Sequence, residues 1–411
     1  MSQSELYAGA AVTDITPPLE VGLLTSSVKA EYASFESIHT PLKARVLVLQ
    51  SGREKLAVVA LDLLSLTDTS VGGWEHFKAE MADVVPAANI VICCTHTHSA
   101  PESGGLTGLY QTPAFIAWLK KMQQDIRAAI RTAAARLQPC TLSVATAILE
   151  GYSLQRRIRL PEGMVISDSL QPVSEALMNG EPVDRRVKTV RLTGKDGQGI
   201  ATVVQAVCHP VHEMCIPAVS ADFPGELCTV LEQSEQNGTA LFLNGAAGDI
   251  NPPTVSMGAA YAKAHGEAMA ERVATQKPLP IADTAFSFQR STIPFTVRDG
   301  SGITNPLDAL ARISLLHFSS LAVLFLPGEI FVETALEIEQ ASPFEHTIIA
   351  GFSENNVGYV PTPRAFEEGG YETGPGKWSF LEKGAAGRIK AAAIDLLQQQ
   401  FYKRNTHLIK S

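Results

Sequence analysis

The sequence predicts an α/β protein with a mixed β-sheet core flanked by helices, and two observations support this fold class. Short apolar, partly β-branched runs alternate along the chain with longer segments of helical periodicity. Several of the short runs are apolar throughout, which is typical of central strands covered on both faces. Apolar residues make up 45% of the 411 residues, so we expect residues 1–411 to form a single domain around one large core.

Nine runs are expected to be strands. In chain order they are residues 44–50, 55–65, 89–94, 140–149, 188–193, 200–208, 239–244, 321–327 and 346–352. The clearest helix follows Pro113, where an apolar stripe at three- and four-residue spacing runs from Phe115 to Leu137. Further helices are expected at 224–236, 257–276, 330–341 and 385–402. Residues 150–185, with Arg, Pro, Gly and Ser between sparse apolar residues, are expected to form a surface excursion or lid.

Composition and charge argue against several classes of partner. Lys and Arg total 33 against 42 Asp and Glu, and no basic run is present, so nucleic acid is not expected to bind. No apolar run reaches the roughly 20 residues that span a bilayer, and the N-terminus does not resemble a signal peptide. We therefore expect a cytoplasmic protein without stable membrane association. The six cysteines form no CxxC pair and are interpreted as buried thiols.

Five of the expected strands end in polar or glycine-rich segments. These segments are THTHSAPESGG, HPVHE, GAAGDINPP, PGE and SENNVGYVPT. In open α/β sheets, binding sites form outside the carboxyl ends of strands, so the five segments can converge on one crevice. This pattern, more than any single residue, indicates an enzyme acting on a small-molecule substrate.

Two histidine-bearing strand ends indicate a metal site. His96 and His98 are two residues apart and would point to the same side if strand geometry persists, while His209 and Glu329 each follow another strand. Two histidines, a carboxylate and an open position are the usual ligand set of a catalytic zinc ion.

Each of these residues also has a structural interpretation. Glu329 can instead favour the first turn of the following helix, and His209 can be a buried histidine with satisfied hydrogen bonds. His212 and Glu213 are interpreted as surface groups, with a role beside the metal ligands as the alternative. Asp249, in GAAGDINPP, is placed to orient a water or to accept from a histidine N–H.

Taken in order, the segments AVTDITPP, NIVICCTHTHSAPESGG, AVCHP, VSADFPGE, LFLNGAAGDINP, LPGE and NNVGYVPT resemble the neutral, non-lysosomal ceramidase family from about residue 8 to about residue 375. The resemblance implies a zinc amidase with an α/β catalytic domain. It implies zinc ligands His96, His209, Glu329 and Tyr359, with His98 beside the metal as a catalytic group. Arg156 resembles a family arginine that reaches the substrate, and the alternative is that Arg156 and Arg157 are a solvated pair.

Three departures from the family pattern bear on the substrate. Asn251 stands where ceramidases have a serine, the tail of the histidine motif contains Ala100, Glu102 and Ser103, and the C-terminal sandwich domain of ceramidases has no counterpart. Asn251 can donate a hydrogen bond to a substrate but cannot act as a nucleophile.

We therefore expect a ceramidase-like hydrolase domain that binds one Zn²⁺ and cleaves a small N-acyl or cyclic amide with metal-activated water. The alternatives are a metal-dependent esterase or lactonase and a non-catalytic binding protein on the same scaffold. Tyr359, an unusual zinc ligand, can equally be a hydroxyl donor or a packed aromatic residue.

Overall fold

The computed structural model describes residues 5–24, 32–171 and 173–409, and it has the expected mixed α/β architecture. A nine-stranded sheet runs in the order β15-β13-β12-β8-β1-β5-β6-β7, with β17 (Leu279–Pro280) paired to β8. The bounds of the strands along this order are β15 (Thr239–Asn244), β13 (Gly199–Ala206), β12 (Arg186–Gly194), β8 (Gln138–Ile148), β1 (Leu6–Asp14), β5 (Lys43–Ser51), β6 (Glu54–Leu61) and β7 (Ile90–Cys94). The parallel pairs are β13 with β15 and β6 with β7.

The large sheet folds back on itself. Strands β1 and β8 pair only through Tyr7↔Pro139 and Ala8↔Gln138, so the sheet turns a corner there. As a result β15, at one end of the strand order, contacts β5, β6 and β7 at the other end. This fold brings strand ends that are distant within the sheet close together in space.

A second sheet closes the interior. It has the order β18-β19-β20-β22, with bounds β18 (Ser287–Pro294), β19 (Leu310–His317), β20 (Leu321–Phe325) and β22 (His346–Ala350). Strands β20 and β22 are parallel. Its inner residues Phe325 and Ile348 pack with Leu47, Val58 and Val203 of the large sheet in one buried cluster.

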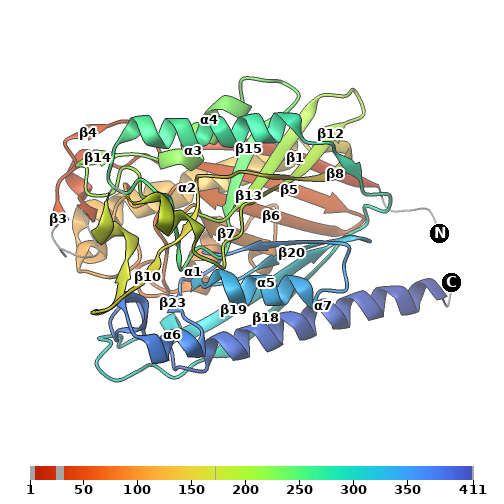
Figure 1. Ribbon diagram of the computed structural model, residues 1–411. Helices are drawn as coiled ribbons and strands as arrows, with labels where there is room; N and C mark the ends of the chain where they lie inside the picture. Colours follow the sequence, from red (N-terminus) through yellow and green to blue (C-terminus); the bar gives the residue numbers. More distant parts are fainter. Residues whose placement is uncertain (1–4, 25–31, 172, 410–411) are drawn as a thin grey trace.

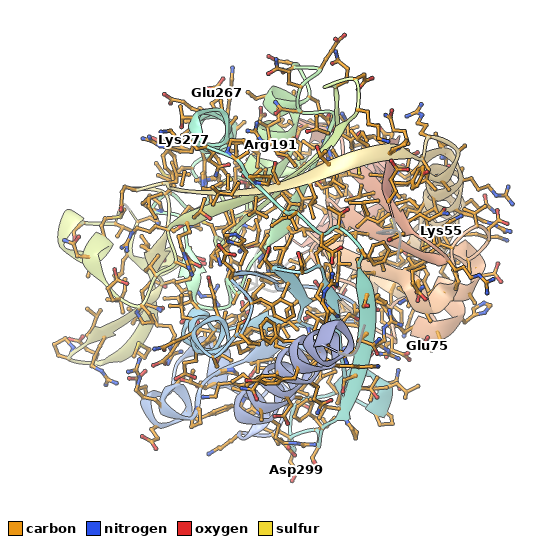
Figure 2. The ribbon with its side chains drawn as sticks, turned by 90° about the vertical axis from the view of Figure 1, so that its right-hand side faces the viewer. Lys55, Glu75, Arg191, Glu267, Lys277 and Asp299 are labelled. Atoms are coloured by element: carbon orange, nitrogen blue, oxygen red, sulfur yellow. The ribbon has the colours of Figure 1, made fainter. Side chains whose placement is uncertain are left out.

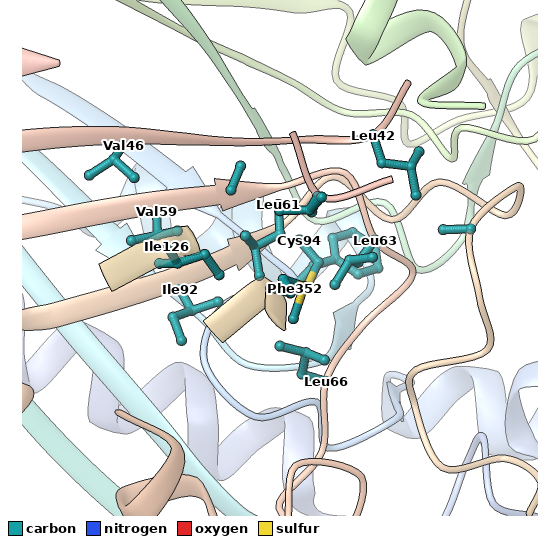
Figure 3. Packing of buried hydrophobic residues seen from close by; sticks show 14 of the residues in the cluster. Leu42, Val46, Val59, Leu61, Leu63, Leu66, Ile92, Cys94, Ile126 and Phe352 are labelled. Carbon is teal, nitrogen blue, oxygen red and sulfur yellow. The ribbon is translucent and has the colours of Figure 1, made fainter. Parts of the chain in front are cut away.

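Helices cover the outer faces of both sheets (Figure 1). The helices are α1 (Trp74–Met81), α2 (Pro113–Ala135), α3 (Asp222–Leu231), α4 (Ala259–Thr275), α5 (Val332–Gln340), α6 (Pro363–Glu368) and α7 (Ala385–Ile409). Helices α1 and α2 pack on β5, β6 and β7, where Ile126 meets Val46, Val59 and Ile92 (Figure 3). Helices α3 and α4 cover β13 and β15, and α5 and α7 cover the second sheet. Charged residues such as Glu75, Glu267 and Asp299 lie at the periphery (Figure 2).

All nine expected strands and all five expected helices are present, with ends shifted by a few residues. Among the longer strands and helices, β1, β18, β19 and α1 were not predicted, and neither were the six-residue helix α6 and the strands of two to four residues. Strand β1 is rich in Ala and Gly, residues that are depleted in strands. Gly9 is there because α2 packs so closely that a Cβ would lie 2.1 Å from the Ala133 carbonyl oxygen. Strand β18 lies at a sheet edge and its residues are mostly half-exposed, so it lacks an apolar run.

Among the described residues, no helix is both long and apolar enough to cross a membrane. All six cysteines are free thiols, and five of them are buried as expected. Cys215 is exposed, so for this residue the expectation of a buried thiol is wrong.

Residues 150–185 form short elements, leaving aside Pro172, which lies outside the described residues. They are β9 (Leu154–Gln155), the β10 (Arg157–Leu160) and β11 (Gly163–Ile166) hairpin, and the 3-10 helices Ser167–Leu170 and Glu175–Asn179. β9 pairs with β16 (Ile250–Asn251). Arg156 and Ser167 are buried, so one side of this segment faces the interior.

Candidate metal centre

Five strand ends meet in one region, although they come from two sheets. Asn244, the last residue of β15, donates through Nδ2 to the carbonyl oxygens of Thr95 and Cys208, at 3.1 and 2.9 Å. The Cys94 N–H donates to Phe352 O at 3.0 Å, and the Gly248 N–H donates to Ile330 O at 2.9 Å. These contacts connect the segments after β7, β13, β15, β20 and β22.

Three histidines and a carboxylate face one another there. The ligand atoms of His96, His98 and His209 all lie within 4.8 Å of one another. Glu329 Oε2 lies 3.4 Å from His96 Nε2 and 3.3 Å from His209 Nε2. All four residues are buried. Two sets of three ligands are therefore available. Both contain His96 and His209, and the third ligand is Glu329 in one set and His98 in the other.

The two shared histidines have fixed ring orientations. His96 Nδ1 lies 2.7 Å from Leu64 O, and His209 Nδ1 lies 3.1 Å from Ile250 O. Because a carbonyl oxygen only accepts, each Nδ1 carries a proton, and in a neutral imidazole Nε2 is then the nitrogen with the lone pair. This second hydrogen bond is the arrangement that orients histidine ligands in metal sites.

The ligand atoms are otherwise unsatisfied. His96 Nε2, Glu329 Oε2 and both ring nitrogens of His98 are buried and have no hydrogen-bond partner among the described residues. Unsatisfied buried polar atoms are costly and rare, so a group of them around one point requires an explanation. A bound cation would satisfy the lone pairs of these atoms, and the three histidines could hold one.

The backbone at His96 does not continue the strand geometry of β7. Strand β7 ends at Cys94, and His96 adopts a φ of 70°, in the left-handed region. The two rings nevertheless lie 5.0 Å apart in an edge-to-face arrangement. The expectation that His96 and His98 address one site is therefore confirmed, although a strained turn and not a continued strand brings the rings together.

Burial governs the protonation of this cluster. Burial, reinforced by nearby His96, holds the pKa of His98 well below its usual value. Burial and the neighbouring Arg156 charge lower the pKa of His209 to about 4. Burial by itself would raise the pKa of Glu329, but His96 and His209 outweigh it and hold this pKa well below its usual range. His98 and His209 are therefore neutral and Glu329 is a carboxylate at neutral pH.

Arg156 approaches this cluster from residues 150–185. Its Nε donates to Glu372 Oε1 at 2.8 Å, and its Nη1 lies 3.3 Å from His209 Nε2. Arg157 donates to the other Glu372 oxygen at 2.5 Å. The side chains of both arginines are at most 5% exposed, so their interpretation as a solvated pair is wrong.

Tyr359 lies next to Glu329 because both belong to a short parallel pair, β21 (Glu329–Ile330) with β23 (Tyr359–Val360). The Arg156 guanidinium lies 5.1 Å from the centre of the Tyr359 ring. Burial raises the pKa of the Tyr359 hydroxyl, while the Arg156 charge opposes the rise.

The free end of the Asn251 side-chain amide is its acceptor oxygen and not the expected N–H donor. Its Nδ2 donates to Asp168 Oδ1 at 2.5 Å and to Ser167 Oγ at 3.1 Å, whereas its Oδ1 is buried without a partner. The expectation that Asn251 donates to a substrate is therefore wrong, because its donor end is already engaged. Asp168 and Ser167 could not be identified from the sequence, because they lie in a polar segment without a recognisable motif.

Asp249 supports the backbone around the site. It accepts from the Val332 N–H at 2.8 Å and from Gln155 Nε2 at 2.9 Å. Burial raises its pKa to about 6. The expected contact with a histidine N–H is not formed, since the Nδ1 atoms of His96 and His209 face backbone carbonyls.

His212 and Glu213 are buried, so their interpretation as surface groups is wrong. His212 Nε2 lies 3.1 Å from His265 Nδ1, and His212 Nδ1 lies 2.8 Å from Thr254 O. Glu213 Oε2 lies 2.5 Å from His39 Nδ1. These polar side chains connect the loop after His209 with α4 and with the N-terminal part of the chain.

No protein-family model and no curated protein matches this sequence. Solved structures do match. Neutral ceramidase from Pseudomonas aeruginosa superimposes with a TM-score of 0.77 and 17% identity, over 97% of this chain and 75% of that chain. A structure described as a ceramidase complexed with C2 superimposes with a TM-score of 0.78 and 15% identity, over 98% of this chain and 76% of that chain.

The chain therefore has a neutral ceramidase-like fold, as the sequence motifs led us to expect. The superposition leaves about a quarter of each neighbour's chain unmatched.

Proposed function

We propose that this protein is a zinc-dependent hydrolase that cleaves a small amide substrate. One observation carries the proposal. Within the part of the chain that the structure describes, the buried atoms His96 Nε2, His98 Nε2 and Glu329 Oε2 lack hydrogen-bond partners, and together with His209 Nε2 they belong to one cluster. The ceramidase-like fold supports the same conclusion independently of this cluster.

The ligand set fits zinc better than other common metals. Imidazole nitrogens with a single carboxylate suit zinc, whereas magnesium and calcium prefer oxygen ligands. Zinc bound here would polarise a substrate carbonyl and lower the pKa of a water molecule to about 7. We assign His96, His209 and Glu329 as ligands because Glu329 Oε2 is nearly equidistant from both Nε2 atoms.

The remaining polar groups would act on the substrate. His98 is neutral and both of its ring nitrogens are free, so it can take a proton from water and return it to the leaving amine. Arg156 has one unpartnered nitrogen, Nη2, which can bind an anionic group of the substrate. We propose that the hydroxyl of Tyr359, the residue paired with Glu329, stabilises negative charge developing on the carbonyl oxygen.

The two neighbours are named as ceramidases, but we propose a smaller and more polar substrate for this chain. Asn251 replaces the serine of the family pattern, and its surroundings are polar rather than apolar, with Ser167, Asp168 and Arg156 nearby. These groups suit hydrogen bonding to a soluble N-acyl or cyclic amide.

Metal analysis combined with a substrate panel tests the proposal. Protein purified without chelator should contain one zinc ion per chain by elemental analysis, and the zinc-loaded protein should hydrolyse soluble N-acyl amides faster than long-chain ceramide in micelles. A metal-free protein would favour the non-catalytic binding protein. Turnover of lactones or esters without amide turnover would favour the esterase alternative.

A further inference from the structure

The side-chain amide of Asn251 is held in one orientation. Its Nδ2 donates to Asp168 Oδ1 at 2.5 Å and to Ser167 Oγ at 3.1 Å. The Ser167 hydroxyl can donate or accept, but a carboxylate oxygen only accepts. Exchanging the two ends of the amide would place Asn251 Oδ1 against Asp168 Oδ1, with two acceptors at hydrogen-bond distance. Asp168 therefore determines that Oδ1 is the free end.

The free oxygen has no partner in residues 5–24, 32–171 and 173–409. Asn251 Oδ1 is buried and makes no hydrogen bond to these residues, and Asn251 is 1% exposed. A buried acceptor left unpaired costs about 1–3 kcal/mol. A ligand that donates a hydrogen bond would remove this cost.

The free oxygen belongs to the same neighbourhood as the candidate metal ligands. Asn251 directly follows Ile250, whose carbonyl oxygen accepts from His209 Nδ1. Asp168 lies close enough to Arg156 for their charges to interact. The unpartnered Nη2 of Arg156 is therefore a donor near the same His209.

We infer that Asp168 holds Asn251 as a hydrogen-bond acceptor for the N–H of a secondary amide, and that the site thereby selects amides over esters. The inference rests on the proposed hydrolase function. An amide has an N–H donor next to the carbonyl carbon, whereas an ester has an oxygen acceptor at the same position. Against Asn251 Oδ1 the amide forms a hydrogen bond, and the ester brings two acceptors together and leaves the buried oxygen unpaired.

A matched pair of inhibitors tests this selectivity without turnover. N-(methylphosphonyl)glycine and O-(methylphosphonyl)glycolate differ only in an N–H that is replaced by oxygen, and both carry a carboxylate for Arg156. Their dissociation constants for the zinc-loaded protein would be measured by calorimetry. We expect the wild-type protein to prefer the N–H compound by tenfold or more, and the Asp168→Asn and Asn251→Leu variants to lose most of this preference.

Controls separate the positioning role of Asp168 from a general structural one. Ser167→Ala removes the other contact of Asn251 Nδ2 and should keep the preference, because Asp168 still orients the amide. Zinc content should be the same in all variants. Equal binding of both compounds to the wild type, or an unchanged preference in both Asp168→Asn and Asn251→Leu, would overturn the inference. If neither compound binds the zinc-loaded wild type, the proposed hydrolase function fails, and the inference fails with it.

Discussion

Glu329 and His98 complete alternative ligand sets around His96 and His209, and substitution distinguishes them. We expect Glu329→Ala and His209→Ala to lose zinc and activity together, because each leaves the site with too few ligands. His98→Ala should retain most of the zinc and lower the turnover number, since a group acting on the transition state does not hold the metal. Elemental analysis and steady-state kinetics of the same preparations measure both effects. Zinc loss in His98→Ala with full occupancy in Glu329→Ala would assign the three-histidine set instead.

The guanidinium of Arg156 has one nitrogen available to bind an anionic group of the substrate. Its Nε is engaged by Glu372, which leaves Nη2 for a ligand. A lysine has no planar fork and cannot both bind Glu372 and reach an anionic substrate in the same way. Arg156→Lys should therefore raise KM about tenfold for substrates with a carboxylate, the effect of one charged hydrogen bond of about 1.4 kcal/mol. KM for a matched uncharged amide should change little, and equal effects on both substrates would argue against this role.

Helix α1 is joined to the loop after β22 by a buried ion pair. Lys78 Nζ lies 3.1 Å from Glu354 Oε2, both side chains are fully buried, and Trp74 Nε1 and Arg290 also donate to Glu354. Removing one partner of a buried pair costs about 3–5 kcal/mol when the remaining charge is uncompensated. Arg290 still pairs with Glu354 in Lys78→Met, so this variant should lower the free energy of unfolding by less than that, about 1–3 kcal/mol in urea titrations. Lys121→Met, which breaks an exposed pair on α2, should change it by less than about 1 kcal/mol.

The first residue of α3 makes stability depend on pH. Burial raises the pKa of Asp222 to about 7, despite hydrogen bonds from the Glu213 and Phe223 N–H groups. Between about pH 4 and pH 7 the unfolded chain releases this proton while the folded chain keeps it, so the free energy of unfolding falls as pH rises. The loss is at most about 4 kcal/mol and is complete above pH 7.

Asp222→Asn should remove this part of the pH dependence. Urea unfolding at pH 4.5 and pH 7.5 gives the change in the free energy of unfolding between the two pH values, and this change should be smaller in the variant than in the wild type. Asp299→Asn, at an exposed position (Figure 2), is the control and should follow the wild type. A variant that loses as much stability as the wild type between the two pH values would contradict the prediction.

At the scale of the whole molecule, the candidate ligands come from segments after β7, β13 and β20, which belong to two sheets. A metal ion bound there would link the sheets and stabilise only the folded state. At a zinc concentration 1,000 times the dissociation constant, the stabilisation is about 4 kcal/mol. Removing zinc with a chelator should therefore lower Tm by several degrees in differential scanning calorimetry. The His209→Ala variant should show no chelator effect.

Much of the fold was predictable from local patterns. Runs such as 89–94 and 239–244 are too short for helices and end at polar or glycine-rich segments, which favours strands, whereas the segment after Pro113 has the three- and four-residue apolar spacing of a helix. Strands β1 and β18 were missed because neither has a strong apolar pattern of its own. Strand β1 is rich in small residues, which allow α2 to pack closely, and β18 is a half-exposed strand at a sheet edge.

Sequence by itself determined the chemistry available to this protein: the histidines and the carboxylate that follow its strands, and their order along the chain. Tertiary structure decided which of these groups meet. The turn at His96, the fold-back of the large sheet and the pairing of β21 with β23 place His96, His209, Glu329 and Tyr359 together. It also decided which end of the Asn251 side-chain amide is free. Asp168, 83 residues from Asn251 along the chain, accepts from Nδ2, so Oδ1 is left as a hydrogen-bond acceptor. Hydrogen-bond direction depends on neighbours in space, and a linear sequence does not specify them.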